Sequence, residues 1–173
     1  MNKIVGAVMI IISTSLMGRK FSDNLKYRIG ELEEIKKIMI MLKGEVMYNV
    51  ASVGEALRKI RARTGEGFEV LIDKVVEELN EHNGKTFDLI WKEGVETYNI
   101  QKNSLTKMDL DRLIGFGNDF GSSHKEIQLK SFDMYIDELE NTIGDARKRN
   151  SENSKMYKSL GILAGFVIVI LII

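Results

Sequence analysis

Few side chains in this sequence are suited to catalysis or metal binding. The two imidazoles, His82 and His124, have no partner at the spacing of a metal site or a catalytic base. Asp109 and Asp111 lack the loop spacing of an EF-hand, and acidic residues that complement a helix dipole explain them. Because there is no cysteine, disulfides, zinc–thiolate sites and thiol catalysis are excluded. The sequence therefore predicts no catalytic residue, no metal and no cofactor, and so a protein that is not an enzyme.

The glycine-rich stretch GFGNDFG, residues 115–121, resembles a phosphate-binding loop only superficially. Phe120 stands where the dinucleotide-binding pattern needs glycine, and no predicted strand precedes the stretch. Gly117 instead lies on a helical stripe between Leu113 and Phe120, where the absence of a Cβ lets a neighbouring helix approach closely. We interpret the stretch as part of a helix-packing motif. The motif comprises Phe116, Gly117, Phe120, Gly121 and Gln128.

The densest basic cluster is RKIRAR, residues 58–63. Its four cations cannot share one helical face, which is typical of a solvated surface. The alternative is contact with an acidic partner or with anionic lipid. A second basic run, ARKRN at residues 146–150, leaves solvated surface and lipid headgroup contact equally open. The candidate partner-binding residues are the four cations of the first cluster: Arg58, Lys59, Arg61 and Arg63.

The composition limits the classes of protein to which the chain can belong. Lysine and arginine total 25 and balance 25 aspartate and glutamate residues, so the formal net charge is zero. This balance argues against a general nucleic-acid binder, since phosphate backbones require a basic footprint. The 173 residues leave room for one domain of ordinary size. The absence of proline favours long, uninterrupted helices, because proline ends helices and shapes loops.

Between residues 21 and 155 apolar residues recur at helical spacing, which predicts an antiparallel bundle of about six helices. A capping box at residues 52–55 begins the second helix, and residues 106–109 begin the fifth. Trp91 is expected in the core rather than at a membrane interface. A long coiled coil is the alternative, which the mid-chain glycines disfavour. The first and last stripes are Leu32, Ile35, Met39, Leu42 and Val46, and Leu129, Phe132, Ile136, Leu139, Ile143 and Ala146.

Apolar segments lie at both ends, at residues 4–18 and 160–173. They predict an N-terminal transmembrane anchor (1–20), a cytosolic helical-bundle domain (21–155) and a C-terminal transmembrane anchor (156–173). A cleaved signal peptide is the alternative for the first segment, and a core helix for the second. By the positive-inside tendency, the cations that flank the segments place the bundle in the cytosol. These membrane-flanking residues are Arg19, Lys20, Lys155 and Lys158.

Along its whole length the chain resembles the stage III sporulation protein AB family of endospore-forming bacteria. The resemblance is carried by GEVMY (44–48), Trp91, FGNDFGSSHKEIQ (116–128) and YKSLGILAGFVIVILI (157–172). In combination these motifs are fairly specific, although none is so singly. The chain departs from the family near Ser52, where members carry proline, and near His124, where they carry aspartate.

This resemblance implies a cytosolic domain similar to that of the inner-membrane platform proteins of type II secretion and type IV pilus machines. It further implies a non-catalytic scaffold in a channel complex between mother cell and forespore, located in the mother-cell membrane around the forespore. The implied partners are a cytosolic secretion-type ATPase and other membrane components of the channel. The rival interpretation is a membrane-anchored helical signalling or sensor module.

Overall fold

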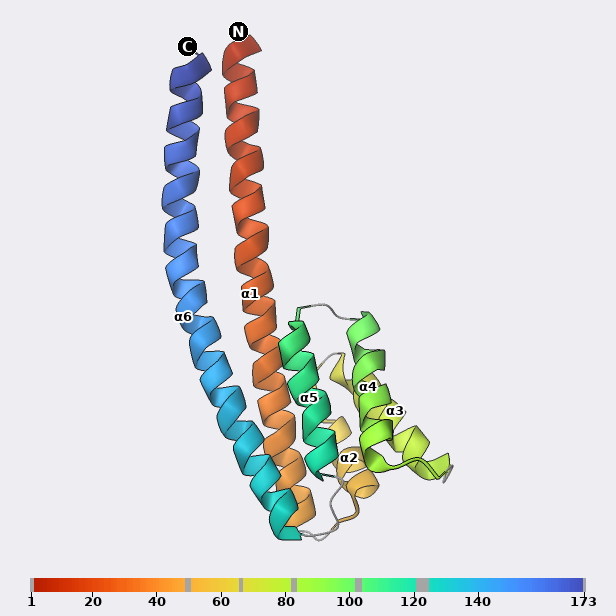
Figure 1. Ribbon diagram of the computed structural model, residues 1–173. Helices are drawn as coiled ribbons and strands as arrows, with labels where there is room; N and C mark the ends of the chain where they lie inside the picture. The colour runs from red at the N-terminus through yellow and green to blue at the C-terminus, as the bar shows by residue number, and fades with distance from the viewer. Residues whose placement is uncertain are drawn as a thin grey trace. The chain divides into compact units, whose positions relative to one another are not determined.

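The structure is a computed structural model that covers residues 1–173. It describes the backbone of residues 2–48, 51–65, 67–81, 84–101, 104–120 and 125–172. Side chains are described for residues 23–47, 51–65, 67–81, 84–100, 104–118, 120 and 126–152. Every regular element in the described backbone is an α-helix, which confirms the all-α fold class (Figure 1).

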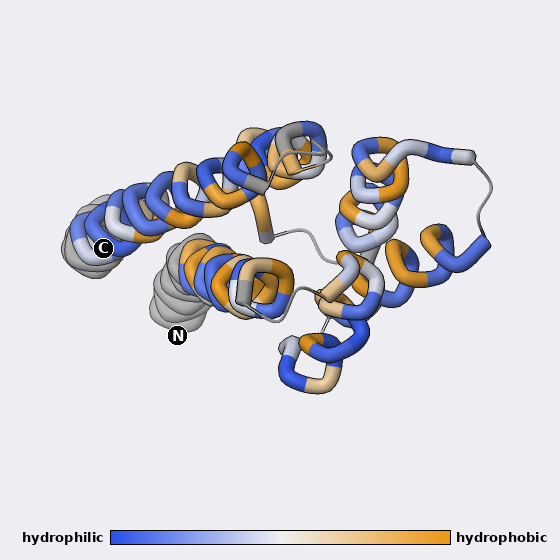
Figure 2. The backbone as a smooth tube through the Cα atoms, turned by 90° about the horizontal axis from the view of Figure 1, so that it is seen from below, coloured by the Kyte–Doolittle hydropathy of each residue, from blue (hydrophilic) through white to orange (hydrophobic). Residues whose placement is uncertain are grey.

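Six helices follow one another along the described chain, as the sequence pattern predicts. Two are long and four are short. The helices are α1 (Asn2–Tyr48), α2 (Val53–Arg61), α3 (Phe68–Glu81), α4 (Phe87–Gln101), α5 (Lys107–Phe120) and α6 (Lys125–Ile172). Hydrophobic residues recur among hydrophilic ones along the described helices, the pattern of helices that each bury one face (Figure 2).

The chain divides into two compact units. One comprises residues 1–29 and 143–173, and the other comprises residues 30–142. The second unit contains α2 to α5 together with the end of α1 and the beginning of α6. This unit positions all the candidate site residues discussed below, and we call it the helical body.

Within the helical body, ion pairs show that α1 and α6 run antiparallel. The Lys36 ammonium lies 2.9 Å from the Glu140 carboxylate, and further along α1 Lys43 pairs with Asp133. Residue numbers thus rise along α1 as they fall along α6. All five residues of the predicted α1 stripe are buried, which confirms that stripe.

The predicted stripe of α6 is only partly correct. Phe132 and Leu139 are buried, but Leu129 is 39% exposed and Ile136 is partly exposed. Tyr135 takes the buried position that the pattern assigns to Ile136. The physical reason is that the Tyr135 ring stacks against Phe116 of α5, with ring centroids 5.4 Å apart, so packing against an aromatic neighbour decides which face is buried.

Aromatic residues form the centre of the helical body. Phe116 on α5 lies within 5.7 Å, centroid to centroid, of Trp91 on α4, Phe120 on α5 and Phe132 on α6. The Trp91 side chain is fully buried, and its Nε1–H donates a 2.7 Å hydrogen bond to the carbonyl oxygen of Leu113. The prediction that Trp91 is a core residue is therefore confirmed.

Charged residues connect the end of α3 to the beginning of α4. Glu78 is buried and accepts hydrogen bonds from Lys74 Nζ at 2.7 Å and from Lys85 Nζ at 2.9 Å. Lys85 also donates to Glu93 on α4. These hydrogen bonds raise the pKa of both lysines, that of Lys74 through Glu78 and that of Lys85 through Glu93 first and Glu78 second. Gly84 supplies the positive φ of 76° in the intervening turn, a conformation that glycine adopts without strain.

Thr106 and Asp109 form a reciprocal capping box at the start of α5. The Asp109 carboxylate accepts from Thr106 N–H at 2.8 Å and from the Thr106 hydroxyl at 2.6 Å, and Asp109 N–H donates to Thr106 Oγ1 at 3.2 Å. These bonds satisfy N–H groups at the helix start that have no intrahelical acceptor. Ser52 similarly confirms the predicted start of α2, because its Oγ accepts from Glu55 N–H at 3.4 Å.

Replacing Asp109 with alanine is expected to lower the free energy of unfolding by about 1–2 kcal/mol, because a buried cap is lost. Asp111→Ala is the matched control, since Asp111 is an exposed carboxylate on the same helix. Its effect should stay within about 0.5 kcal/mol. Urea unfolding followed by circular dichroism measures both. Equal losses in the two variants would contradict a specific capping role for Asp109.

The structure does not support the predicted membrane topology. In the part of the chain that the structure describes, no helix offers a stretch of sufficient length and apolar character to cross a bilayer. This finding contradicts the prediction of a two-span protein in the mother-cell membrane, which is therefore corrected.

The side chains of residues 1–22 and 153–173 lie outside the described residues. These ranges include the segments assigned to the two anchors. They also include the predicted membrane-flanking residues: Arg19, Lys20, Lys155 and Lys158.

Candidate functional site

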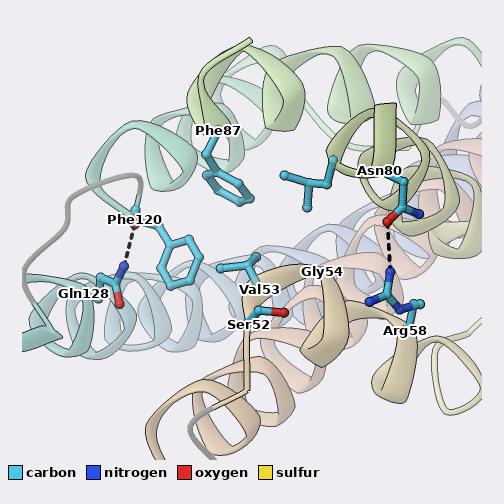
Figure 3. A pocket seen from close by; sticks show the side chains of 9 residues that line it. Ser52, Val53, Gly54, Arg58, Asn80, Phe87, Phe120 and Gln128 are labelled. Atoms are coloured by element: carbon cyan, nitrogen blue, oxygen red, sulfur yellow. Dashed lines mark hydrogen bonds between the residues drawn. The ribbon is translucent and has the colours of Figure 1, made fainter. Parts of the chain in front are cut away.

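A groove of about 440 Å³ opens in the helical body at the N-terminus of α2 (Figure 3). Its apolar walls are Val53 of α2, Leu79 of α3, Phe87 of α4 and Phe120 of α5. Side chains from four helices thus converge on one opening. We call it the α2 groove.

Four polar side chains complete the lining of the α2 groove: Ser52, Arg58, Asn80 and Gln128. Arg58 is exposed, and its Nη1 donates a 3.2 Å hydrogen bond to Asn80 Oδ1 (Figure 3). Gln128 Nε2 donates to the carbonyl oxygen of Phe120 at 3.2 Å. Arg58 is the one ionised residue of this lining, so the charge that lines the described groove is positive.

Local structure explains why these polar groups gather here. Ser52 is present because α2 needs an N-cap, and Gln128 reaches the last residue of α5, where helix carbonyls lack intrahelical donors. A Cβ added to Gly54 would lie 3.6 Å from Leu79 Cδ1, an ordinary van der Waals contact. The first turn of α2 therefore lies directly against α3, and this contact forms one wall of the groove.

The four cations of the basic cluster have different surroundings. Lys59 lies 3.4 Å from Glu45 and 3.8 Å from Glu55. Arg61 forms a two-point ion pair with Asp73, in which Nη2 lies 2.6 Å from Oδ2. Arg58 contacts a neutral amide, and Arg63 is exposed and has no ion pair among the described residues. Lys59 and Arg61 are thus occupied within the helical body, which leaves Arg58 and Arg63 as the cations available to a partner.

Because Arg61 and Asp73 form an ion pair, we expect the free energy of unfolding to fall slightly as the solution becomes acidic. Hydrogen bonding by Arg61 lowers the pKa of Asp73, and desolvation opposes this shift. Because the folded-state pKa lies below the unfolded value of about 3.9, the stabilisation is present at neutral pH and is lost as the pH falls through the folded-state pKa. The effect should be small, since the two side chains are 48% and 50% exposed.

Asp73→Asn is the variant that tests this expectation. The free energy of unfolding of the wild type should exceed that of Asp73→Asn at pH 7, and the difference should shrink below about pH 4. Urea unfolding at about pH 7 and about pH 3 gives both values. If the difference in the free energy of unfolding between the wild type and Asp73→Asn were larger at about pH 3 than at about pH 7, the predicted direction of the pH dependence would be wrong.

The helix-packing motif is divided between the core and the groove. Phe116 and Gly117 are buried in the core, while Phe120 and Gln128 line the α2 groove. A Cβ on Gly117 would lie 2.7 Å from Trp91 Cγ and 2.9 Å from Trp91 Cβ, so the indole lies directly on the helix backbone. Gly121 lies outside the described residues.

Sequence reasoning missed the residues that complete the groove. Val53, Leu79, Asn80 and Phe87 come from three helices, and no local pattern indicates that they meet. The one signal available was the capping box at residues 52–55, which locates the start of α2. The tertiary arrangement then brings Arg58 of the basic cluster to the same opening as Phe120 and Gln128.

The two aspartates that could suggest a cation site are not arranged as one among the described residues. Asp109 serves as a cap, Asp111 is exposed, and both histidines lie outside the described residues. Over the part of the chain that is described, no group of three or more potential metal ligands occurs.

A model of the stage III sporulation protein AB family matches residues 3–173 of the chain. The chain belongs to this family. It is 24% identical over 172 residues to stage III sporulation protein AB of Bacillus subtilis (strain 168), and the match covers 99% of each chain. No solved structure matches. The stage III sporulation protein AB family indicates a role in sporulation, and it is not a known enzyme family.

Proposed function

We propose that the protein is a non-catalytic scaffold of a secretion-like channel complex between mother cell and forespore. It couples a cytosolic secretion-type ATPase to other components of that complex. Membership of the stage III sporulation protein AB family supports the link to endospore formation. The helical body supports the scaffold role, since it places a fixed aromatic core behind an exposed groove.

One observation carries the proposal. The α2 groove joins Arg58, a predicted partner-binding residue, to Phe120 and Gln128 of the predicted packing motif, although these residues are far apart in sequence. A groove with apolar walls and one available cation is suited to contact with a protein. The same residues offer no nucleophile–base pair for catalysis.

The proposal is tested by complex formation between the purified full-length protein and the purified secretion-type ATPase encoded alongside it. Analytical ultracentrifugation should show a complex for the wild type. Reversing all four cations (R58E, K59E, R61E and R63E) should abolish it, while circular dichroism shows that the helices are retained. An ATPase that does not bind the wild-type protein would overturn the proposed coupling.

The rival function, a helical signalling module, requires a buried titratable group that is free to switch. Glu31, Glu78 and Asp109 are the carboxylates buried among the described residues. Burial first, and the neighbouring Glu31 carboxylate second, raise the pKa of Tyr98, so Glu31 lies beside a neutral hydroxyl. Glu78 is held by two lysines and Asp109 by its capping box. The contacts of Glu78 and Asp109 favour a fixed helical body, which supports the scaffold over a signalling module.

A further inference from the structure

We propose that the α2 groove binds an acidic peptide segment of a partner protein. One apolar side chain of the segment occupies the space between Val53, Leu79, Phe87 and Phe120, and a neighbouring carboxylate pairs with Arg58. This inference rests on the proposed scaffold function and specifies the chemistry of the surface through which a partner is held.

The shape and walls of the groove determine the first part of the segment. Its volume of about 440 Å³ falls within the range of roughly 300–1,000 Å³ that ligand pockets have. Two aromatic rings and two aliphatic side chains line it, from four different helices. An aliphatic or aromatic side chain that enters the groove leaves water and contacts all four, which is how anchor residues bind at protein interfaces.

The charge of the groove determines the second part of the segment, its carboxylate. A guanidinium has five N–H donors, and Arg58 uses one of its nitrogens on the neutral Asn80 amide. The other donors remain available for a two-point contact with a carboxylate. Val53 and Gly54 also line the groove at the start of α2, where helix N–H groups carry partial positive charge. The Arg58 guanidinium and the N-terminus of α2 therefore both favour a negatively charged ligand.

Polar amide side chains border the groove on two opposite sides. Asn80 and Gln128 each make a hydrogen bond within the helical body, Asn80 with Arg58 and Gln128 with the Phe120 carbonyl oxygen (Figure 3). An extended segment thus finds an apolar site and a cation side by side, which suits two neighbouring side chains of a peptide.

The test uses a fluorescein-labelled synthetic peptide in which two leucines alternate with aspartates, added to the full-length protein. Fluorescence anisotropy should show saturable binding. Two analogues separate the contributions: in one, asparagine replaces each aspartate, and in the other, alanine replaces each leucine. Each analogue should bind at least about tenfold more weakly, since charge pairing and apolar burial both contribute. Absence of saturable binding by the first peptide would overturn the inference.

Two protein variants and one control locate the binding site. Arg58→Glu reverses the cation, and Gly54→Leu places an apolar side chain inside the groove; each should weaken peptide binding at least about tenfold. Lys107→Glu makes the same charge change outside the groove, on an exposed residue at the start of α5, and should change affinity less than about twofold. An equal loss in Arg58→Glu and Lys107→Glu would show unspecific charge attraction and overturn the inference.

Circular dichroism and urea unfolding of Arg58→Glu and Gly54→Leu separate lost binding from lost folding, because a folded variant keeps the helical signal and a cooperative unfolding transition. Arg58 is exposed, so its replacement should leave the fold intact. The two groove variants are then tested with the ATPase. If the wild type binds the ATPase but Arg58→Glu and Gly54→Leu bind it equally well, the groove is not the contact and the scaffold proposal stands. If the peptide binds as expected and the ATPase does not bind, the groove stands and the ATPase coupling fails.

Discussion

Trp91→Ala is expected to lower the free energy of unfolding by about 3–5 kcal/mol, the largest loss of any single substitution considered. The indole is fully buried, stacks on Phe87 and meets Phe116 edge to face, with centroids 5.8 and 5.7 Å away. Removing it leaves a cavity at the junction of α4 and α5 and eliminates the hydrogen bond to the Leu113 carbonyl.

Circular dichroism in urea is the appropriate measurement, because Trp91 is the one tryptophan of the chain and its fluorescence disappears with it. Trp91→Phe should lose less, about 1–2 kcal/mol, since a ring is retained and the N–H donor is lost. Leu89→Ala is the matched control: it lies on the same helix and is 49% exposed. A loss in Leu89→Ala as large as that in Trp91→Ala would contradict the assignment of Trp91 to the core.

Gly117→Ala is expected to destabilise the protein by about 1–3 kcal/mol, although alanine is the better helix former. The new Cβ would lie less than 3.0 Å from Trp91 Cγ and Cβ, so the indole or the helix must move. The indole cannot turn away freely, because its N–H donates to the Leu113 carbonyl oxygen on α5 and this bond holds the ring against the helix.

Gly115→Ala is the matched control for Gly117→Ala. Both glycines lie in α5, but nothing lies within 4 Å of a Cβ added to Gly115. The control should therefore gain up to about 1 kcal/mol from helix propensity alone. If the indole lies on Gly117, thermal or urea unfolding should show a lower stability than the wild type for Gly117→Ala and a higher stability for Gly115→Ala. A gain in both variants would contradict the close contact.

The sequence was most informative where the signal is local. The α1 stripe, the caps at Ser52 and Thr106 and the burial of Trp91 all follow from periodicity or from hydrogen bonds within one turn. Such patterns depend on neighbours three or four residues away, which the sequence shows directly. The all-α fold with six helices in the described chain follows from the same signals.

The remaining features depend on contacts between distant segments. Tyr135 rather than Ile136 is buried because of a ring on another helix, and the α2 groove forms from residues between 52 and 128. The ion pairs that occupy Lys59 and Arg61 also involve residues outside the basic cluster, Glu45 and Asp73. Charge patterning indicated a basic cluster, but only the tertiary structure distinguishes its occupied cations from its available ones.

Glu78 and the two lysines that bind it should differ in how well they tolerate substitution. Glu78 is held by two ammonium groups, so the loss of either Lys74 or Lys85 still leaves the carboxylate a counterion. The loss of Glu78 instead removes the counterion that both lysines share, and leaves Lys74 with Glu77 at 3.9 Å and Lys85 with Glu93 at 2.7 Å. Replacing one lysine should therefore destabilise the protein less than replacing Glu78, whose loss affects both lysines.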